Sequence, residues 1–153
     1  MKIARPLIPM GHALPGDCWR SCIATLIERP CSEVPHFVHE CGEVDFVTFT
    51  RDWLREQGFD LFETNYPATW ALDDILKWAS ATDNPGLPFI LSGHPPCDDP
   101  QEGHAVIVQD GAIVHDPGNC GLDGPSLCRD DAPGPARWWV HVICLSRDWS
   151  DKR

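Results

Sequence analysis

Cys18 lies at a position where a helix is expected to begin. The segment from Pro15 to Pro30 reads PGDCWRSCIATLIERP: a Pro-Gly turn, an aspartate, and then a run with apolar residues on one helical face. Asp17 is a preferred N-cap residue and Pro30 cannot continue a helix, so we expect a helix from Cys18 to Glu28. The free N–H groups and partial positive charge of a helix N-terminus stabilise a thiolate. Cys18 is therefore a candidate nucleophile, and its own N–H can face a developing oxyanion.

A second cysteine, Cys22, lies one turn further along the same expected helix. It shares a helical face with Leu26, which predicts a place in the core rather than at a reactive site. Two alternatives stay open at this point. Either Cys22 is the nucleophile instead, or Cys18 is an unreactive thiol packed in a helix.

The second half of the chain offers a base and an orienting acceptor for such a nucleophile. The segment HAVIVQDGAIVHDP has two β-branched runs around Asp110-Gly111, which predicts a β-hairpin. A three-residue loop, Gln109 to Gly111, would pair His104 with Asp116 on one face of the hairpin. A two-residue loop would put them on opposite faces, because side chains alternate along a strand. A catalytic role for both residues therefore predicts the longer loop, with Gly111 in the left-handed conformation.

Other histidines are weaker candidates for the base. His115 neighbours Asp116 and is expected to face the other way, His141 lies in the middle of an apolar strand, and His94 lies in a loop. We expect His141 to be a core group with its hydrogen bonds satisfied. The alternative for His104 is that it is an ordinary histidine at the end of a strand.

The stretch HFVHEC, with His36, His39 and Cys41, is the nearest approach to a metal-ligand cluster. The chain has no C-x-x-C pair, which weakens the case for structural zinc. We interpret this stretch as a surface turn, and we expect neither a metal site nor a cofactor.

The elements that must position these residues follow from hydrophobic periodicity. After the first helix we expect a helix from Phe46 to Gln57 with Phe46, Phe49, Trp53 and Leu54 facing inward, a short strand in FDLFE, and a helix in ALDDILKWASA. Later segments read as strands: PFILSG, the two arms of the hairpin, and RWWVHVICL, which is apolar on both faces. Helices that precede antiparallel strands indicate the α+β class.

Composition limits the compartment and the partners. A chain of 153 residues fits a single domain, 1–153. The formal net charge of −11 argues against nucleic-acid partners and against binding to anionic membranes. The proline-interrupted N-terminus resembles no secretory signal, and no segment approaches transmembrane length. We therefore expect a cytoplasmic protein whose eight cysteines are all reduced.

At Gly16-x-Cys18-Trp19 and at GHAVIV…VHDP the sequence resembles the papain-like cysteine peptidases. It is most similar to the bacteriocin-processing peptidases that cleave double-glycine leaders, and to small papain-like proteins of bacteria and phages. The resemblance covers roughly residues 11–35 and 88–121. It implies a helix that carries the nucleophile, packed on an antiparallel sheet.

The resemblance also implies roles for individual residues. Cys18 is the implied nucleophile, His104 the base and Asp116 the group that orients the base. Papain-like enzymes place a glutamine about six residues before the cysteine to help form the oxyanion hole, and His12 stands there in this sequence. We expect His12, Asp17 and Trp19 to border the oxyanion and substrate site.

The chemistry expected from these residues is hydrolysis of a peptide or isopeptide bond through a cysteine thioester, on a peptide or protein substrate. Two alternatives stay open: acyl transfer or deamidation by the same three residues, and a catalytically weak binding module of the same fold. The loop from Ser92 to Gly103, rich in proline and acidic residues, is expected to overhang the site and to favour positive or neutral peptides.

Overall fold

The structure, a computed structural model, describes residues 1, 17–67, 69–93, 103–117 and 137–146. The helical segments are α1 (Asp17–Leu26), η1 (Cys31–Glu33), α2 (Phe37–Glu40), α3 (Phe46–Glu56), α4 (Leu72–Trp78) and η2 (Ala79–Asp83). The strands are β1 (Phe59–Pro67), β2 (Phe89–Gly93), β3 (His104–Gln109), β4 (Ala112–His115) and β5 (Arg137–Leu145).

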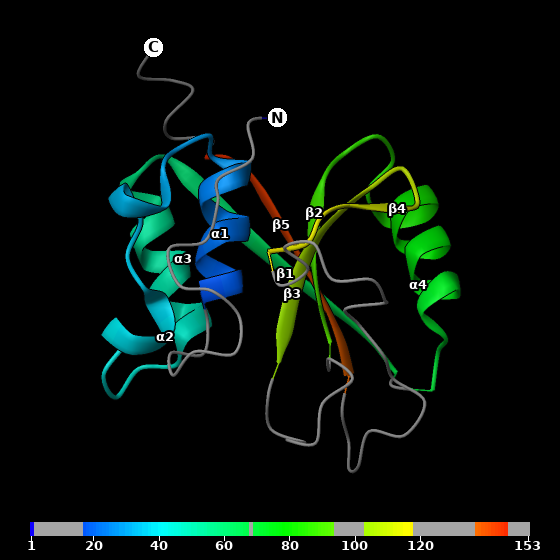
Figure 1. Cartoon of the computed structure of the whole chain (residues 1–153), viewed down its shortest axis with the longest axis horizontal. Coiled ribbons are helices and arrows are strands. Elements are labelled where there is room, and N and C mark those ends of the chain that lie inside the picture. Colours follow the sequence, from blue (N-terminus) through cyan, green and yellow to red (C-terminus); the bar gives the residue numbers. More distant parts are fainter. Residues whose placement is uncertain (2–16, 68, 94–102, 118–136, 147–153) are drawn as a thin grey trace.

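The strands form one five-stranded antiparallel sheet in the order β1-β5-β2-β3-β4 (Figure 1). The last strand in sequence, β5, therefore lies between the first two. The α+β class expected from the sequence is confirmed. The strand expected in FDLFE is longer than predicted, because β1 pairs with β5 along its whole length, from Phe59 opposite Leu145 to Pro67 opposite Arg137.

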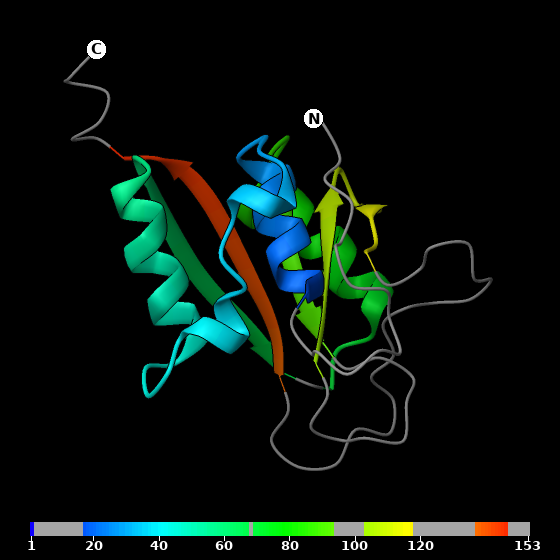
Figure 2. The same ribbon diagram turned by 60° about the vertical axis from the view of Figure 1, so that its left-hand side comes forward.

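Helices cover both faces of the sheet. Figures 1 and 2 show α1, α2 and α3 on one side and α4 on the other. Strand alternation explains this arrangement, because neighbouring residues of β3 belong to different cores. Ala105 and Ile107 pack with α1, α2 and α3, whereas Val106 and Val108 pack with α4 and the buried indole of Trp138. Both cores contain fully buried apolar side chains, so each face of the sheet is stabilised by burial of apolar surface.

The helix from Phe46 follows its local sequence signals. Asp45 caps α3, its carboxylate accepting hydrogen bonds from the backbone N–H of Thr48 at 2.9 Å and from the Thr48 hydroxyl at 2.6 Å. Leu54 is fully buried, as expected. Phe46 was expected to face inward, but 37% of it is exposed at the start of the helix, where its ring forms a T-shaped pair with that of Trp19.

The prediction that β5 is covered on both faces is correct only near its middle. Trp138, Val140 and His141 are buried, so both faces of this part are covered. Trp139 is 38% exposed and Leu145 is 54% exposed, because α1 and α3 do not cover the ends of the strand completely. In the part of the chain that the structure describes, no helix combines the length and the apolar character needed to cross a membrane.

Candidate active site

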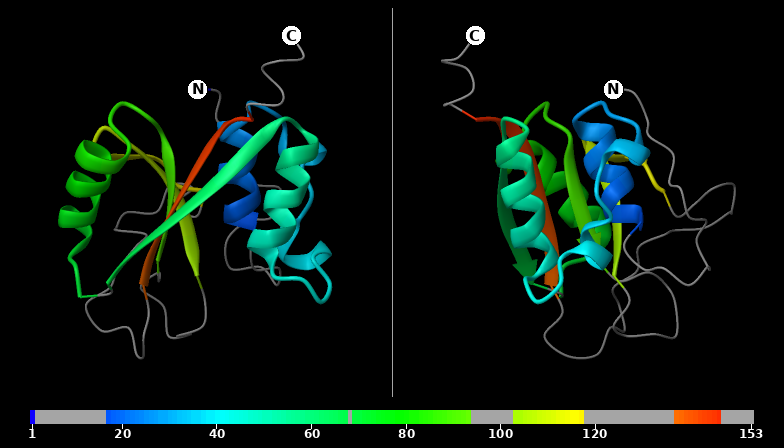
Figure 3. Two further views of the ribbon diagram at one scale, coloured as in Figure 1. Left: turned by 180° about the vertical axis from the view of Figure 1, so that it is seen from behind. Right: turned by 90° about the vertical axis from the view of Figure 1, so that its left-hand side faces the viewer.

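Cys18 lies in the first turn of α1 and is half-buried. The inner face of the helix, which includes Ile23 and Ala24, is fully buried against the sheet, and this packing holds α1 beside β3. Views from behind and from the side show the start of α1 and the start of β3 at the same end of the molecule (Figure 3). The helix therefore brings Cys18 to the end of β3 at which His104 stands.

The hairpin that carries His104 differs from the one predicted. Gln109 pairs directly with Ala112, so the loop has two residues, Asp110 and Gly111, and not three. Both have positive φ, 51° and 81°, which is the pattern of a type I′ turn. The predicted pairing of His104 with Asp116 is therefore wrong. The physical reason is that a type I′ turn matches the right-handed twist of the strands without an extra loop residue.

A β-bulge in β4 offsets the shorter loop. Val108 pairs with Ile113, but the next residue along, Ile107, pairs with His115, so Val114 is the extra residue. One added residue reverses the alternation, which returns Asp116 to the side of the hairpin that carries His104. His104 and Asp116 thus lie on the same side of the hairpin, as expected, but because of the bulge and not because of a three-residue loop.

His104 and Asp116 are in direct contact. His104 Nε2 lies 2.7 Å from Asp116 Oδ1, and the imidazole side chain is 2% exposed against 13% for the carboxylate. The expected neighbourhood of these two side chains is confirmed. Because Nε2 faces the carboxylate, Nδ1 is the ring nitrogen left for another partner.

Cys18 supplies a second contact to the same ring. Burial by itself disfavours the charged imidazole, but hydrogen bonds with Asp116 and Cys18 outweigh it and raise the pKa of His104 to about 9. At neutral pH the ring is therefore an imidazolium held between a carboxylate and a sulfur.

Cys22 is a core residue, as expected from its helical face. It is fully buried, and desolvation raises the pKa of its thiol well above the ordinary value. A thiol in such surroundings stays protonated and does not act as a nucleophile. The alternative in which Cys22 reacts is therefore disfavoured by its burial.

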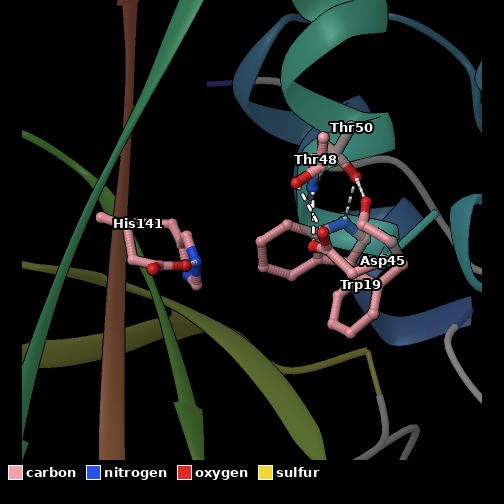
Figure 4. A network of polar contacts seen from close by, with 7 residues as sticks. Trp19, Asp45, Thr48, Thr50 and His141 are labelled. Carbon is pink, nitrogen blue, oxygen red and sulfur yellow. Dashed lines mark hydrogen bonds and ion pairs between the residues drawn. The ribbon is translucent and has the colours of Figure 1, made fainter.

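Asp17 and Trp19, the residues on either side of Cys18, are both buried. The carboxylate of Asp17 accepts a hydrogen bond from Arg20 Nε at 2.7 Å and forms an ion pair with the guanidinium. The indole N–H of Trp19 donates to Thr50 Oγ1 at 2.9 Å, and its ring lies 4.8 Å from that of His141 (Figure 4). Trp19 therefore packs α1 against α3 and β5, and its side chain does not line an exposed substrate site. His12 lies outside the described residues.

The remaining histidines have separate surroundings. His141 is buried, and its Nε2 lies 2.7 Å from Glu63 Oε2, while its Nδ1 has no hydrogen-bond partner among the described residues. The expectation that His141 is a core residue is correct, but only one of its two ring nitrogens has the expected hydrogen bond. Burial lowers the pKa of His141 despite the carboxylate. His94 and most of the loop that follows Gly93 lie outside the described residues.

The stretch HFVHEC forms a short helix, α2, and not a turn. His36 is buried before it, and its ring lies 4.5 Å from that of His39. Desolvation lowers the pKa of His36, so the ring is neutral. Within residues 17–67, 69–93, 103–117 and 137–146, no group of three or more potential ligand side chains is placed to hold a metal ion.

Sequence reasoning missed one polar contact at the site. His115 Nε2 lies 3.1 Å from the hydroxyl oxygen of Ser21, and both residues are buried. The alternation that turns Asp116 toward His104 also turns His115 toward α1. Strand alternation did predict that His115 faces away from Asp116. The partner of His115, Ser21, could not be predicted, because it depends on how α1 packs on the sheet.

The chain was compared with protein-family models, with curated proteins and with solved structures, and none of them matches it.

Proposed function

We propose that this protein is a papain-like cysteine hydrolase that cleaves an amide bond, in a peptide or an isopeptide linkage, through a thioester at Cys18. The observation that carries the proposal is the contact of His104 with both Cys18 and Asp116. Three separate elements supply these residues: α1, the start of β3 and the end of β4. A nucleophile, a base and an orienting carboxylate in this order are the parts that acyl transfer to a cysteine requires.

The charge state of His104 suits the first step. The Cys18 thiolate attacks the carbonyl carbon of the amide, and a carbon–sulfur bond forms as the carbonyl π electrons move to the oxygen. The oxyanion then collapses, the carbon–nitrogen bond breaks, and the imidazolium of His104 gives its proton to the leaving amine. The products of this half-reaction are a Cys18 thioester, a free amine and a neutral imidazole.

The second step regenerates the enzyme. Neutral His104 takes a proton from water, and the resulting hydroxide attacks the thioester carbon. The carbon–sulfur bond breaks, which releases a carboxylic acid and restores the thiolate beside the imidazolium. Asp116 stays ionised throughout, because its role is to hold the ring in position and to stabilise its positive form.

Stabilisation of the oxyanion falls to donors near the start of α1. The backbone N–H of Cys18 belongs to the first turn, where N–H groups have no acceptor within the helix. The imidazole of His12 is the second donor in this proposal, at the position where the papain-like enzymes have glutamine. Loss of one such donor costs about 3 kcal/mol of transition-state stabilisation.

Selective thiol alkylation tests the nucleophile. The intact protein is treated with a limiting amount of iodoacetamide at pH 7, and the modified cysteine is identified by peptide mass spectrometry. Cys18 is expected to react first, and His104→Ala is expected to slow its modification. Cys144 is the internal reference, because it is a free cysteine that the reagent can reach. Partial burial of its thiol, and then the charge of Asp60, raise the pKa of Cys144, so it is expected to react slowly. If Cys18 reacts no faster than Cys144, the proposed nucleophile is wrong.

Hydrolysis itself is tested with a peptide mixture and two proteins, the wild type and Cys18→Ala. New N-termini are expected with the wild type only, and an acyl adduct on Cys18 is expected when the reaction is quenched in acid. Transfer of the acyl group to an added amine in place of water would identify an acyltransferase. No adduct and no new termini, with a reactive Cys18, would contradict hydrolysis.

A further inference from the structure

His115 joins the strand that carries Asp116 to the helix that carries Cys18. His115 is the last residue of β4 and is buried, and its Nε2 lies 3.1 Å from the hydroxyl oxygen of Ser21 in α1. Ser21 is fully buried. The hydrogen bond therefore lies inside the packed layer between α1 and the sheet, where replacement by water is costly.

Both partners are close in sequence to the candidate catalytic residues. His115 precedes Asp116 directly, so holding its ring holds the backbone from which Asp116 projects. Ser21 follows Cys18 by three residues, which places the two on the same side of α1, one turn apart. The hydrogen bond between Ser21 and His115 thus joins the helix that carries Cys18 to the strand end that carries Asp116.

The strand β4 needs such a support. It is four residues long, lies at the edge of the sheet as described, and pairs with β3 through a ladder that a bulge interrupts. The bulged residue, Val114, comes immediately before His115. Pairing with β3 alone therefore leaves the direction of the strand after the bulge weakly determined, since a bulge disrupts the ladder and bends the strand.

The surroundings of His115 favour a neutral ring, which suits a hydrogen bond to a hydroxyl. Burial lowers the pKa of His115, against a smaller opposite effect of Asp116. The hydroxyl of Ser21 also forms a hydrogen bond with the thiol of Cys31, which fixes its orientation further.

We propose that Ser21 and His115 are positioning residues of the candidate active site: their hydrogen bond sets Asp116 against His104 by anchoring the end of β4 to α1. The inference deepens the proposed function and rests on it for its catalytic meaning. The positional part is independent, because it concerns the contact of Asp116 with His104 in the absence of substrate.

The titration of His104, followed by NMR of the ring protons in the intact protein, tests the inference. The His104 signal is identified by its loss in His104→Gln. Ser21→Ala and His115→Phe each remove the hydrogen bond, and each is expected to lower the titration midpoint of His104 by about 1 pH unit or more, because a displaced carboxylate no longer favours the charged ring. The double variant is expected to lower it no further, since both changes remove the same bond.

Two further variants make the result specific. His115→Gln can place an amide group near the position of Nε2 and is expected to restore part of the midpoint. Ser80→Ala is the matched control, because Ser80 accepts a hydrogen bond from the backbone N–H of Gly111 at 2.9 Å and so anchors the opposite end of the same hairpin. It is expected to leave the His104 midpoint unchanged.

An unchanged midpoint in folded Ser21→Ala overturns the proposal, whatever His115→Phe does. A Ser80→Ala midpoint as low as that of Ser21→Ala also overturns it, because the effect would then be general loosening of the hairpin. If the midpoints shift as expected but no amide is hydrolysed, the proposed function fails and the positioning role stands.

Discussion

His104 is the residue on which the proposed chemistry depends. Its side chain is almost fully buried, yet its pKa is raised to about 9, because hydrogen bonds with Asp116 and Cys18 outweigh the cost of burying a charge. The other buried histidines with shifted titration, His36, His115 and His141, shift in the opposite direction. Among these four rings, His104 alone has its charged form favoured by the fold.

This difference predicts a pH dependence of stability. The ordinary pKa of 6.5 rises to about 9 on folding, so the stabilisation is fully present below pH 6.5 and is lost as the pH rises through 9. Asp116→Asn is expected to destabilise the protein by about 2 kcal/mol at pH 6, and by much less at pH 9.5. Urea unfolding at pH 6, 7.5 and 9.5 measures the difference.

The control for this measurement is Glu63→Gln, which removes the carboxylate that contacts the buried ring of His141. His141 has a lowered pKa, so this variant is not expected to lose its effect between pH 6.5 and 9. Parallel stability curves for the wild type and Asp116→Asn across this range would contradict the assignment of a charged His104.

Gly93 stands at a position where the surroundings leave no room for a side chain. It pairs with His104, and a Cβ at this position would lie 2.6 Å from one ring carbon of Trp138 and 2.8 Å from another. Trp138 is fully buried and cannot move freely. Gly93→Ala is therefore expected to destabilise the protein by about 1–3 kcal/mol through overpacking, measured by urea unfolding.

Gly103→Ala is the matched control, because a Cβ there meets no atom of the described residues within 4 Å. It lies beside His104 on the chain and is expected to change stability by less than about 0.5 kcal/mol. Equal destabilisation by the two substitutions would show that packing against Trp138 is not the reason why glycine stands at position 93.

At the scale of elements, the β3–β4 hairpin combines two local devices. Its two-residue turn sets one register and the bulge at Val114 changes it by one residue. The two-residue turn without the bulge would put Asp116 on the side of the hairpin away from His104. A three-residue loop without the bulge would put both on one side, but it would match the twist of the strands less well than the type I′ turn. Together they deliver a buried pair at the end of an edge strand.

The turn predicts a substitution pattern at Asp110, whose φ of 51° is unusual for a residue other than glycine. Asp110→Val is expected to destabilise the protein by about 1–2 kcal/mol, because a β-branched side chain crowds the left-handed conformation. Asp110→Asn is expected to be neutral, since asparagine suits this position of a type I′ turn. Thermal unfolding of both variants measures the effect. A neutral Asp110→Val would instead favour the three-residue loop.

At the scale of the whole molecule, the candidate site lies where element ends meet and not in the core. The starts of α1 and β3 and the end of β4 converge there, while the two apolar cores on either face of the sheet lie beside it. Loops at the ends of elements can generally change in sequence without loss of the core.

The thiols provide a prediction for the whole chain. Cys18, Cys22, Cys31, Cys41 and Cys144 are free in the structure, and the other three cysteines lie outside the described residues. We expect all eight thiols to be reduced, because the sequence has no paired cysteine spacing such as C-x-x-C. Titration with a thiol reagent in denaturant without reductant is expected to count eight. A count of four or fewer would contradict the expectation of reduced thiols.

Local signals in the sequence determined the elements and the identity of the candidate residues. Proline and periodicity predicted the helices that begin at Asp17 and Phe46 to within two residues, although Asp17 is the first residue of its helix and not the N-cap that we expected. The hairpin was evident from its β-branched runs around Asp110-Gly111. These features depend on neighbours along the chain, so no knowledge of the packing is needed to predict them. His104 and Asp116 could be selected as partners because both belong to one hairpin.

Tertiary structure decided the rest. The position of β5 between β1 and β2 depends on pairing between residues far apart in the sequence, and the bulge at Val114 has no sequence signature of its own. The burial of Trp19 against Thr50 and the contact of His115 with Ser21 both require α1 to be packed on the sheet. Side chains of one type serve as core groups or as site groups according to which face of an element is covered, and that is settled only when the helices and the sheet come together.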